Sequence, residues 1–143
     1  MGYEKYEAKR TYYHGTWFRS NLEARVAQAL TALGIAWEYE RQCFRDERFP
    51  HEQYTPDFHL PNSDAYVEVC GEFDARHRAN ASVLCELLGS TRDSPRVVVV
   101  GGDGDMRGCW VEGGRLLSRR ARWRVESGVE VGNIFDAAGM KRW

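Results

Sequence analysis

The apolar positions in the first third of the chain change from a helical period to an alternating one. Between residues 20 and 33 apolar side chains recur every three or four positions, which predicts an amphipathic helix. Gly34 follows at the place of a helix C-terminal cap. Residues 36–44 alternate and include aromatic side chains, as is typical of a strand. The charged segment 45–53 contains a proline and is therefore predicted to be a loop.

The middle of the chain predicts two short strands, a second helix and a buried strand. Residues 55–60 and 65–70 are the two strands, and the turn-forming sequence PNSD joins them. A helix is expected over residues 72–88 or 74–88, because apolar residues recur there at helical spacing. The valine run within residues 96–100 favours a strand buried on both faces. The order helix, three strands, helix, strand predicts an α/β fold with a mixed central sheet flanked by helices.

The last third of the chain predicts a basic β-hairpin. Two strands, at residues 108–112 and 115–125, flank a Gly113-Gly114 turn. Strand spacing places three arginines on one face of the second strand, and we take them as the candidate DNA-binding residues: Arg120, Arg122 and Arg124. The alternative is a charged outer face that protects an edge strand from aggregation. A short helix is expected at residues 134–138.

Composition supports a single compact domain. The 143 residues are 43% hydrophobic and 13% aromatic, which is enough for a packed core. We expect residues 1–16 to form an N-terminal arm, residues 17–106 the core, and residues 107–143 a C-terminal basic hairpin extension of the same domain. No apolar run is long enough to cross a bilayer, and the N-terminus lacks the apolar region of a signal peptide. We therefore expect a cytoplasmic protein without a membrane partner.

Charge and cysteine content narrow the classes of partner. The formal net charge is −1, but six arginines and one acid lie between residues 107 and 124, and such an excess suits phosphate binding. The bland alternative for this cluster is a solvated, solubilising face. The four cysteines form no C-x-x-C pair, which argues against a zinc ribbon. We expect free thiols, as is usual in a reducing compartment.

Two acids occupy the polar face of the predicted strand pair. Asp57 and His59 share one face of the first strand, and Glu68 and Cys70 share one face of the second. The residues between them are apolar and are expected to face a core. Two carboxylates held close together repel each other unless a cation lies between them. Hard oxygen ligands select Mg²⁺ or Mn²⁺, although strand-end acids that merely face solvent are the alternative.

Four short segments occur in order along the first half of the chain, at residues 18–25 (FRSNLEAR), 34–40 (GIAWEYE), 54–61 (YTPDFHLP) and 66–71 (YVEVCG). Over residues 17–102 the chain thereby resembles the PD-(D/E)XK nucleases, and more narrowly their small phage and bacterial members. The resemblance implies an αβββαβ restriction-endonuclease-like core, with the C-terminal hairpin as an extension. It also implies hydrolysis of phosphodiester bonds in DNA with Mg²⁺ or Mn²⁺, by a protein that a phage encodes for expression in its bacterial host.

The resemblance assigns roles by position. Asp57 and Glu68 would be the metal ligands, and Glu23, on the first helix, would be a further acid that holds a metal or its water. The sequence leaves a second role for Glu23 open, because Ser20-x-x-Glu23 is also a capping box. The family motif ends in a lysine, and Cys70 stands at that position in this chain. The candidate catalytic set is therefore Glu23, Asp57, Glu68 and Cys70.

A thiol at the lysine position supplies no positive charge to the transition state. Three explanations stay open: a cation from elsewhere replaces the lysine, another polar residue positions the water while a second metal neutralises the charge, or the site is inactive. The candidate substitutes for the lysine are Arg41, Arg76, His77 and Arg78. The candidates for positioning the water are Glu72 and Gln42.

Two functions follow from these observations. The first is a DNA endonuclease that is structure-selective or weakly specific, because the small chain has no room for a separate recognition domain. A homodimer is a candidate assembly, since cleavage of both strands is commonly carried out by dimers. The second is a catalytically silent relative that binds DNA or a protein partner.

Overall fold

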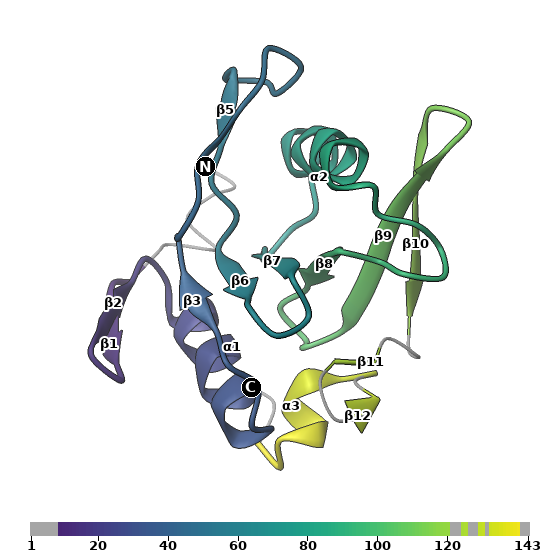
Figure 1. The fold of residues 1–143 in the computed structure, drawn as a ribbon. Helices are drawn as coiled ribbons and strands as arrows, with labels where there is room; N and C mark the ends of the chain where they lie inside the picture. Colours follow the sequence, from purple (N-terminus) through teal and green to yellow (C-terminus); the bar gives the residue numbers. More distant parts are fainter. Residues whose placement is uncertain (1–8, 121–123, 126–128, 131, 141–143) are drawn as a thin grey trace.

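A six-stranded mixed sheet forms the centre of the protein (Figure 1). The computed structural model describes residues 9–120, 124–125, 129–130 and 132–140. The strands of the sheet lie in the order β10-β9-β8-β7-β6-β3, and only β7 and β8 run parallel among these described strands. Their bounds are β3 Glu38–Tyr39, β6 Phe58–Leu60, β7 Ala65–Val69, β8 Val97–Val100, β9 Met106–Glu112 and β10 Arg115–Arg120.

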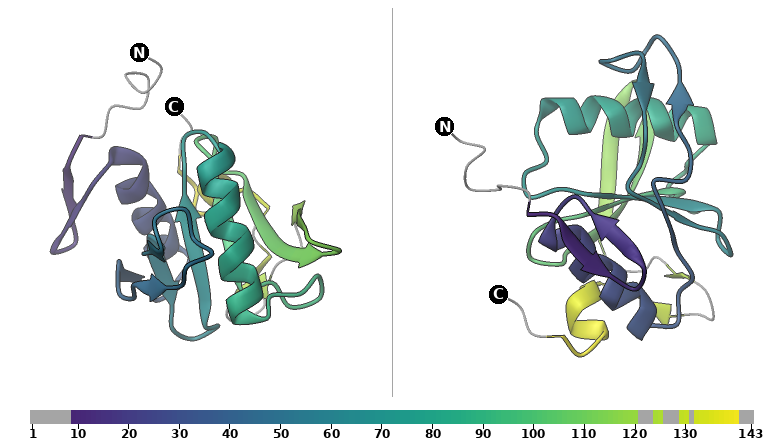
Figure 2. Two further views of the ribbon diagram at one scale, coloured as in Figure 1. Left: turned by 90° about the horizontal axis from the view of Figure 1, so that it is seen from above. Right: turned by 90° about the vertical axis from the view of Figure 1, so that its left-hand side faces the viewer.

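Helices cover both faces of this sheet, so the prediction of a mixed α/β fold is confirmed. Helix α1 (Asn21–Ala32) packs with the short helix α3 (Ile134–Ala137), and α2 (Ala75–Leu88) lies on the opposite face (Figure 2). The predicted helices agree with these bounds to within a few residues. Ser20 and Asp74 cap the N-termini of α1 and α2, because each side chain accepts a hydrogen bond from a backbone N–H of the first turn.

The two faces of the sheet carry separate apolar cores. Phe58 and Val67 belong to the core under α1, whereas Tyr66 and Cys70 belong to the core under α2. Every residue of β7 is consequently buried. We expected the face that carries Asp57, His59, Glu68 and Cys70 to be the polar one. Instead α2 packs over the part that carries Cys70, and Asp57 and Glu68 at its end are also buried.

The N-terminal segment contains structure that the sequence did not predict. Strands β1 (Thr11–Tyr13) and β2 (Thr16–Phe18) form an antiparallel hairpin beside α1. His14 and Gly15 connect them with φ angles of 51° and 79°. Two consecutive residues with positive φ are the geometry of a tight hairpin turn. The sequence assigned no strand to this N-terminal arm, whereas its described part contains most of this hairpin.

The segment after α1 also differs from its prediction. The single strand expected at residues 36–44 is interrupted after β3, where Glu40 has a φ of 48°. Strands β4 (Phe44–Arg45) and β5 (Gln53–Tyr54) then pair with each other, outside the main sheet. Part of the expected loop 45–53 is thus a second hairpin. It rises beside α2 in Figure 1.

The C-terminal hairpin is confirmed, and residues 124–125, at the end of its predicted second strand, belong to a different strand. Strands β9 and β10 flank Gly113 and Gly114, which both have positive φ. Strand β10 is described as far as Arg120, and residues 121–123 of the predicted strand lie outside the described residues. Beyond it, β11 (Arg124–Val125) pairs with β12 (Val129–Glu130) as a separate two-stranded sheet. In the described part of the chain, no helix combines the length and the apolar character that crossing a bilayer requires.

Candidate active site

Strand pairing brings the two predicted acids together at one end of the sheet. Strand β6 is antiparallel to β7, with Phe58 opposite Val67. Continuing this register by one residue places Asp57 opposite Glu68. Asp57 and Glu68 expose only 3% and 8% of their surface. The backbone N–H of Val69 donates to Asp57 Oδ2 at 2.7 Å, which fixes the orientation of this carboxyl group.

Glu23 adds a third acid from the first turn of α1. Its backbone N–H donates to Ser20 Oγ at 3.1 Å, which is one half of a capping box. Its carboxylate does not return the bond in the described residues; instead Oε1 accepts from the Tyr39 hydroxyl at 3.1 Å. Glu23 is 5% exposed and also hydrogen-bonds to Asp57. The two roles left open by the sequence are thus divided, because the backbone caps the helix while the side chain joins the acidic cluster.

Arg19 is the residue of this site that sequence reasoning missed. Its Nη2 atom lies 3.0 Å from Glu40 Oε2, 3.2 Å from Asp57 Oδ1 and 3.9 Å from Glu23 Oε2. Its backbone N–H donates to the Tyr39 hydroxyl at 3.2 Å. The one available signal was its position four residues before Glu23, directly ahead of the helix cap. We call Arg19, Glu23, Asp57 and Glu68 the acidic cluster.

Burial governs the electrostatics of the acidic cluster. Desolvation is the main cause that raises the pKa of Glu68 to about 8; Arg19 and Arg76 oppose this shift, and the charge of Glu23 adds to it. The pKa of Asp57 is also well above its usual value, because the carboxyl is buried and lies beside Glu23. Oε2 of Glu68 is buried without a hydrogen-bond partner among the described residues. The acidic cluster is therefore short of positive charge and of donors.

The carboxyl oxygens of the acidic cluster are ligands that suit a hard divalent cation. Three buried carboxyl groups, one with an unpaired oxygen, are the ligand type that Mg²⁺ and Mn²⁺ prefer. Within the described ranges, no three or more His, Cys, Asp or Glu side chains form a group that could hold a metal ion. In this structure the guanidinium of Arg19 lies between the carboxyl groups of the acidic cluster. Glu23, Asp57 and Glu68 therefore fit a cation by chemistry, in an arrangement that has an arginine as its counter-ion.

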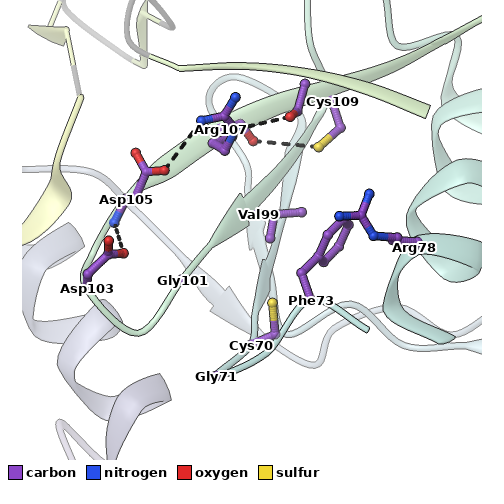
Figure 3. Close-up of a pocket in the computed structure, with 11 residues that line it drawn as sticks. Cys70, Gly71, Phe73, Arg78, Val99, Gly101, Asp103, Asp105, Arg107 and Cys109 are labelled. Carbon is purple, nitrogen blue, oxygen red and sulfur yellow. Dashed lines mark hydrogen bonds and ion pairs between the residues drawn. The ribbon is translucent and has the colours of Figure 1, made fainter. Parts of the chain in front are cut away.

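Cys70 faces the α2 side of the sheet and not the guanidinium. All four cysteines are free, as expected, and Cys70 is 5% exposed. Burial raises the pKa of its thiol to about 12, so the side chain is neutral. It lines a cavity of about 270 Å³ together with Phe73, Arg78, Val99 and Arg107 (Figure 3). The position at which the sequence resemblance expects a lysine thus carries no charge in this chain.

The expected substitutes for the lysine lie in different places. Arg41 pairs with Glu38 on the exposed surface. Arg78 lies over the Phe73 ring at 4.8 Å, in the cavity of Figure 3. His77 bonds to Asp74 at 2.7 Å, at the start of α2. Arg76 is exposed, and its charge lowers the pKa of Glu68. Of these four, Arg76 alone acts electrostatically on the acidic cluster as the structure describes it.

The three arginines expected to bind DNA are not on one continuous strand. Arg120 ends β10 and pairs through Nε with Asp105 Oδ1 at 2.7 Å. Arg122 lies outside the described residues. Arg124 belongs to β11, in the separate small sheet. The exposed guanidinium of Arg120 is therefore already paired with an acid, and a role of these residues in DNA binding stays a prediction.

A family model supports the nuclease part of the sequence resemblance. The model described as phage endonuclease I matches residues 1–87, which is more than half of the chain. The matched span contains Arg19, Glu23, Asp57, Glu68 and Cys70. It ends within α2, before β8 and the C-terminal hairpin. No curated protein and no solved structure matches the chain.

Proposed function

Because this chain belongs to the phage endonuclease I family, we propose that it is a divalent-metal-dependent endonuclease that hydrolyses phosphodiester bonds in DNA. The observation that carries the proposal is the acidic cluster. Three acids from α1, β6 and β7 meet in a buried place where their mutual repulsion is only partly offset. Perturbed acids of this kind are typical of catalytic sites.

The order of elements supports the PD-(D/E)XK assignment within this family. Along the chain, the main sheet and its two long helices follow the order α1, β3, β6, β7, α2, β8, which is the αβββαβ order that the resemblance implies. Asp57 precedes β6, Glu68 lies within β7, and Glu23 lies within α1, as that assignment requires. In this proposal the restriction-endonuclease-like core is residues 17–106, and β9 and β10 extend it.

The proposed reaction is the addition of water to a phosphodiester. The water oxygen bonds to phosphorus, the bond from phosphorus to one sugar oxygen breaks, one proton of the water is released to solvent or to a base, and the leaving oxygen takes up a proton. A Mg²⁺ or Mn²⁺ ion held by Glu23, Asp57 and Glu68 would supply Lewis acidity and lower the pKa of the attacking water. The chain contributes the orientation of the acids: Val69 N–H holds Asp57, and the Tyr39 hydroxyl holds Glu23.

Substrate and assembly are parts of the same proposal. Arg120, Arg122 and Arg124 are proposed to bind phosphates of the DNA backbone, which predicts binding that weakens steeply with salt. The chain is small and its acids lie at the end of one sheet, which suits selection by DNA structure more than by sequence. A homodimer would place two such sites on the two strands. Each of these points rests on the endonuclease assignment.

Cys70 favours one alternative function. A buried neutral thiol at the lysine position removes a charge that cleavage of a phosphodiester normally uses. A catalytically silent relative that binds DNA or a protein through the same surface is the second candidate. This candidate predicts DNA binding without any cleavage in Mg²⁺ or Mn²⁺.

Nicking of supercoiled plasmid separates the two functions. We expect the purified chain to nick plasmid, and to cut branched duplexes faster than linear ones, only when Mg²⁺ or Mn²⁺ is present. Asp57→Ala and Glu68→Ala should each reduce the rate by at least about 1000-fold, because each removes a proposed metal ligand. Asp93→Ala, at an exposed acid outside the acidic cluster, is the matched control and should keep its rate. Bound but uncut DNA in both metals would favour the silent relative.

A further inference from the structure

Arg19 is the cation that lies closest to the proposed reaction centre in the described chain. Its guanidinium contacts Asp57 and Glu40 within 3.2 Å, and Glu23 lies at 3.9 Å. Its charge also lowers the pKa of Glu68. All the acids that the proposed function uses therefore lie within reach of one side chain. That side chain stands on the α1 side of the site, away from the cavity that Cys70 lines.

The guanidinium of Arg19 contacts acids through one of its nitrogen atoms, and the side chain is largely exposed to solvent. All its described contacts with acids use Nη2, and the side chain as a whole is 62% exposed. A guanidinium carries five N–H donors in a planar fork. The side chain also hydrogen-bonds to Tyr39, and its exposed part can reach a second acceptor while Nη2 stays on Asp57. An arginine held in this way can hold a phosphate oxygen next to the carboxyl groups.

The surrounding contacts fix the position of Arg19 better than those of the rival cations. The backbone N–H of Arg19 donates to the Tyr39 hydroxyl, and the same hydroxyl donates to Glu23. Phe18, the preceding residue, is fully buried and packs edge-on against Tyr39 with ring centroids 4.6 Å apart. The base of the side chain is thus anchored on both sides. Arg41 and Arg78, in contrast, are engaged by Glu38 and Phe73, away from the acidic cluster.

We propose that Arg19 takes over the role of the missing motif lysine, binding the phosphate group that is cleaved and offsetting the negative charge that develops on it. The inference rests on the proposed function and adds a residue to it. Nearby acids and Tyr39 keep the guanidinium charged, although partial burial alone would lower its pKa. Arg19 therefore transfers no proton in this step. Its contribution is electrostatic, and it takes effect when water has added to phosphorus.

Replacement of Arg19 by glutamine tests the proposal. Arg19→Gln should reduce the single-turnover nicking rate by about 100-fold, since one charged donor to a transition state contributes on that order. Arg41→Gln is the matched control, because the two arginine side chains are 62% and 61% exposed and both pair with glutamates. Its rate should stay within about threefold of the unmodified protein, as should that of Arg78→Gln.

Binding of Mn²⁺ distinguishes a catalytic arginine from a structural one. If Arg19 only holds the acids in place, Arg19→Gln should weaken Mn²⁺ binding and lose rate in parallel. If Arg19 acts on the phosphate, the variant should bind Mn²⁺ as tightly as before or more tightly, because a positive charge beside the acids has gone. Calorimetric titration with MnCl₂ measures this without DNA. DNA affinity in Ca²⁺, under conditions where no product forms, then reports ground-state binding separately.

Rescue provides the second test. In the Arg19→Gln background, Cys70→Lys should raise the nicking rate at least about tenfold above that of Arg19→Gln alone. The reason is that it places a cation at the position where the resemblance expects the lysine. Arg19→Lys should keep part of the rate, since it preserves the charge but not the fork. Thermal unfolding of each variant checks that the fold survives.

The experiments distinguish a failure of the Arg19 inference from a failure of the endonuclease proposal. An unmodified protein that nicks DNA, with an Arg19→Gln variant that nicks equally well, would overturn this inference and leave the endonuclease standing. A rate loss that follows a loss of Mn²⁺ binding, or that neither lysine variant recovers, would also overturn it. An unmodified protein that never nicks DNA would overturn both.

Discussion

Two groups of charged side chains at the edge of the same sheet differ in how their charges balance. The first is a surface network around His59, whose Nδ1 lies 2.8 Å from Glu38 Oε1 and whose Nε2 lies 3.0 Å from Asp64 Oδ1. Arg41 pairs with Glu38, and Arg96 pairs with Asp64. Each acid of this surface network therefore has its own arginine and shares one imidazole.

The acidic cluster is the opposite case. Glu23, Asp57 and Glu68 are almost fully buried and share the single guanidinium of Arg19. Burial lifts the pKa of Glu68 to about 8, whereas the bond to His59 lowers the pKa of Glu38. The same kind of side chain is thus disfavoured as an ion in one place and favoured as an ion in the other.

The difference indicates what each group does. A balanced network on the surface contributes to the stability of the folded chain, though modestly. Buried like charges lower stability, and a chain retains them where they bind a ligand or perform chemistry. Under the proposed function, the surface network stabilises the fold and the acidic cluster carries the chemistry, and substitutions in each group can test this difference.

Glutamine at position 68 should separate stability from activity most clearly. Glu68→Gln removes a proposed metal ligand, so the nicking rate should fall by at least about 1000-fold. The metal-free protein should at the same time become more stable at pH 7, by as much as about 3 kcal/mol, since glutamine needs no proton to be neutral. Urea unfolding and plasmid nicking on the same preparation measure the two effects.

Glu38→Gln is the matched change in the surface network. Loss of the bonds to His59 and Arg41 should lower stability, while the nicking rate stays within a few-fold of the unmodified protein. The comparison would be broken if Glu68→Gln destabilised the metal-free protein. It would also be broken if Glu38→Gln abolished nicking.

The stability of the metal-free protein should depend on pH in a direction set by the acidic cluster. The pKa of Glu68 is raised from 4.5 to about 8 in the folded state, so its favourable contribution is complete below pH 4.5 and is lost as the pH rises to 8. Asp57 acts in the same direction. The free energy of unfolding should therefore fall by about 3–4 kcal/mol between pH 5 and pH 8.

Two measurements sharpen that prediction. Mg²⁺ at saturating concentration should flatten the pH dependence, because the cation binds the ionised acids of the folded chain. Acids with lowered pKa values, such as Asp46 and Asp74, change the stability only at more acidic pH. They do not contribute to the change between pH 5 and pH 8. Stability that is constant or rises from pH 5 to pH 8 without metal would mean that Glu68 and Asp57 ionise as readily in the folded chain as in the unfolded one.

Sequence patterns predicted the acids but not their surroundings. Alternation along two short strands with a PNSD turn was enough to pair Asp57 with Glu68, because the register of a hairpin follows from its turn and its apolar face. The same reasoning placed both acids on a polar face. It failed to predict their burial, because the side chains around them, such as Arg19 and Glu23, come from a segment distant in sequence.

Tertiary contacts determine the features that were missed. Strand β3 ends at Tyr39, and the next residue, Glu40, has a positive φ and donates a hydrogen bond from its N–H to the Asp57 carbonyl oxygen at 2.9 Å. Such a bond depends on the approach of a strand far along the chain, and no local pattern encodes it. Arg19 meets partners 4, 21 and 38 positions away for the same reason. Periodicity along the sequence predicts which face of one helix or strand is apolar. The acidic cluster depends instead on how α1, β6 and β7 meet in space.

Restoring the lysine in the unmodified protein should have the smallest effect. If Arg19 already supplies the positive charge at the phosphate, the lysine of Cys70→Lys is a second cation that the reaction does not need. The single-turnover nicking rate should then change by less than about threefold. The variant should lose about 1–3 kcal/mol of stability, because the new side chain enters the packed core under α2. Nicking assays and thermal unfolding measure both. A gain of about tenfold or more would mean that the natural site lacks positive charge. Arg19 would then be a structural counter-ion, as the arginines of the surface network are.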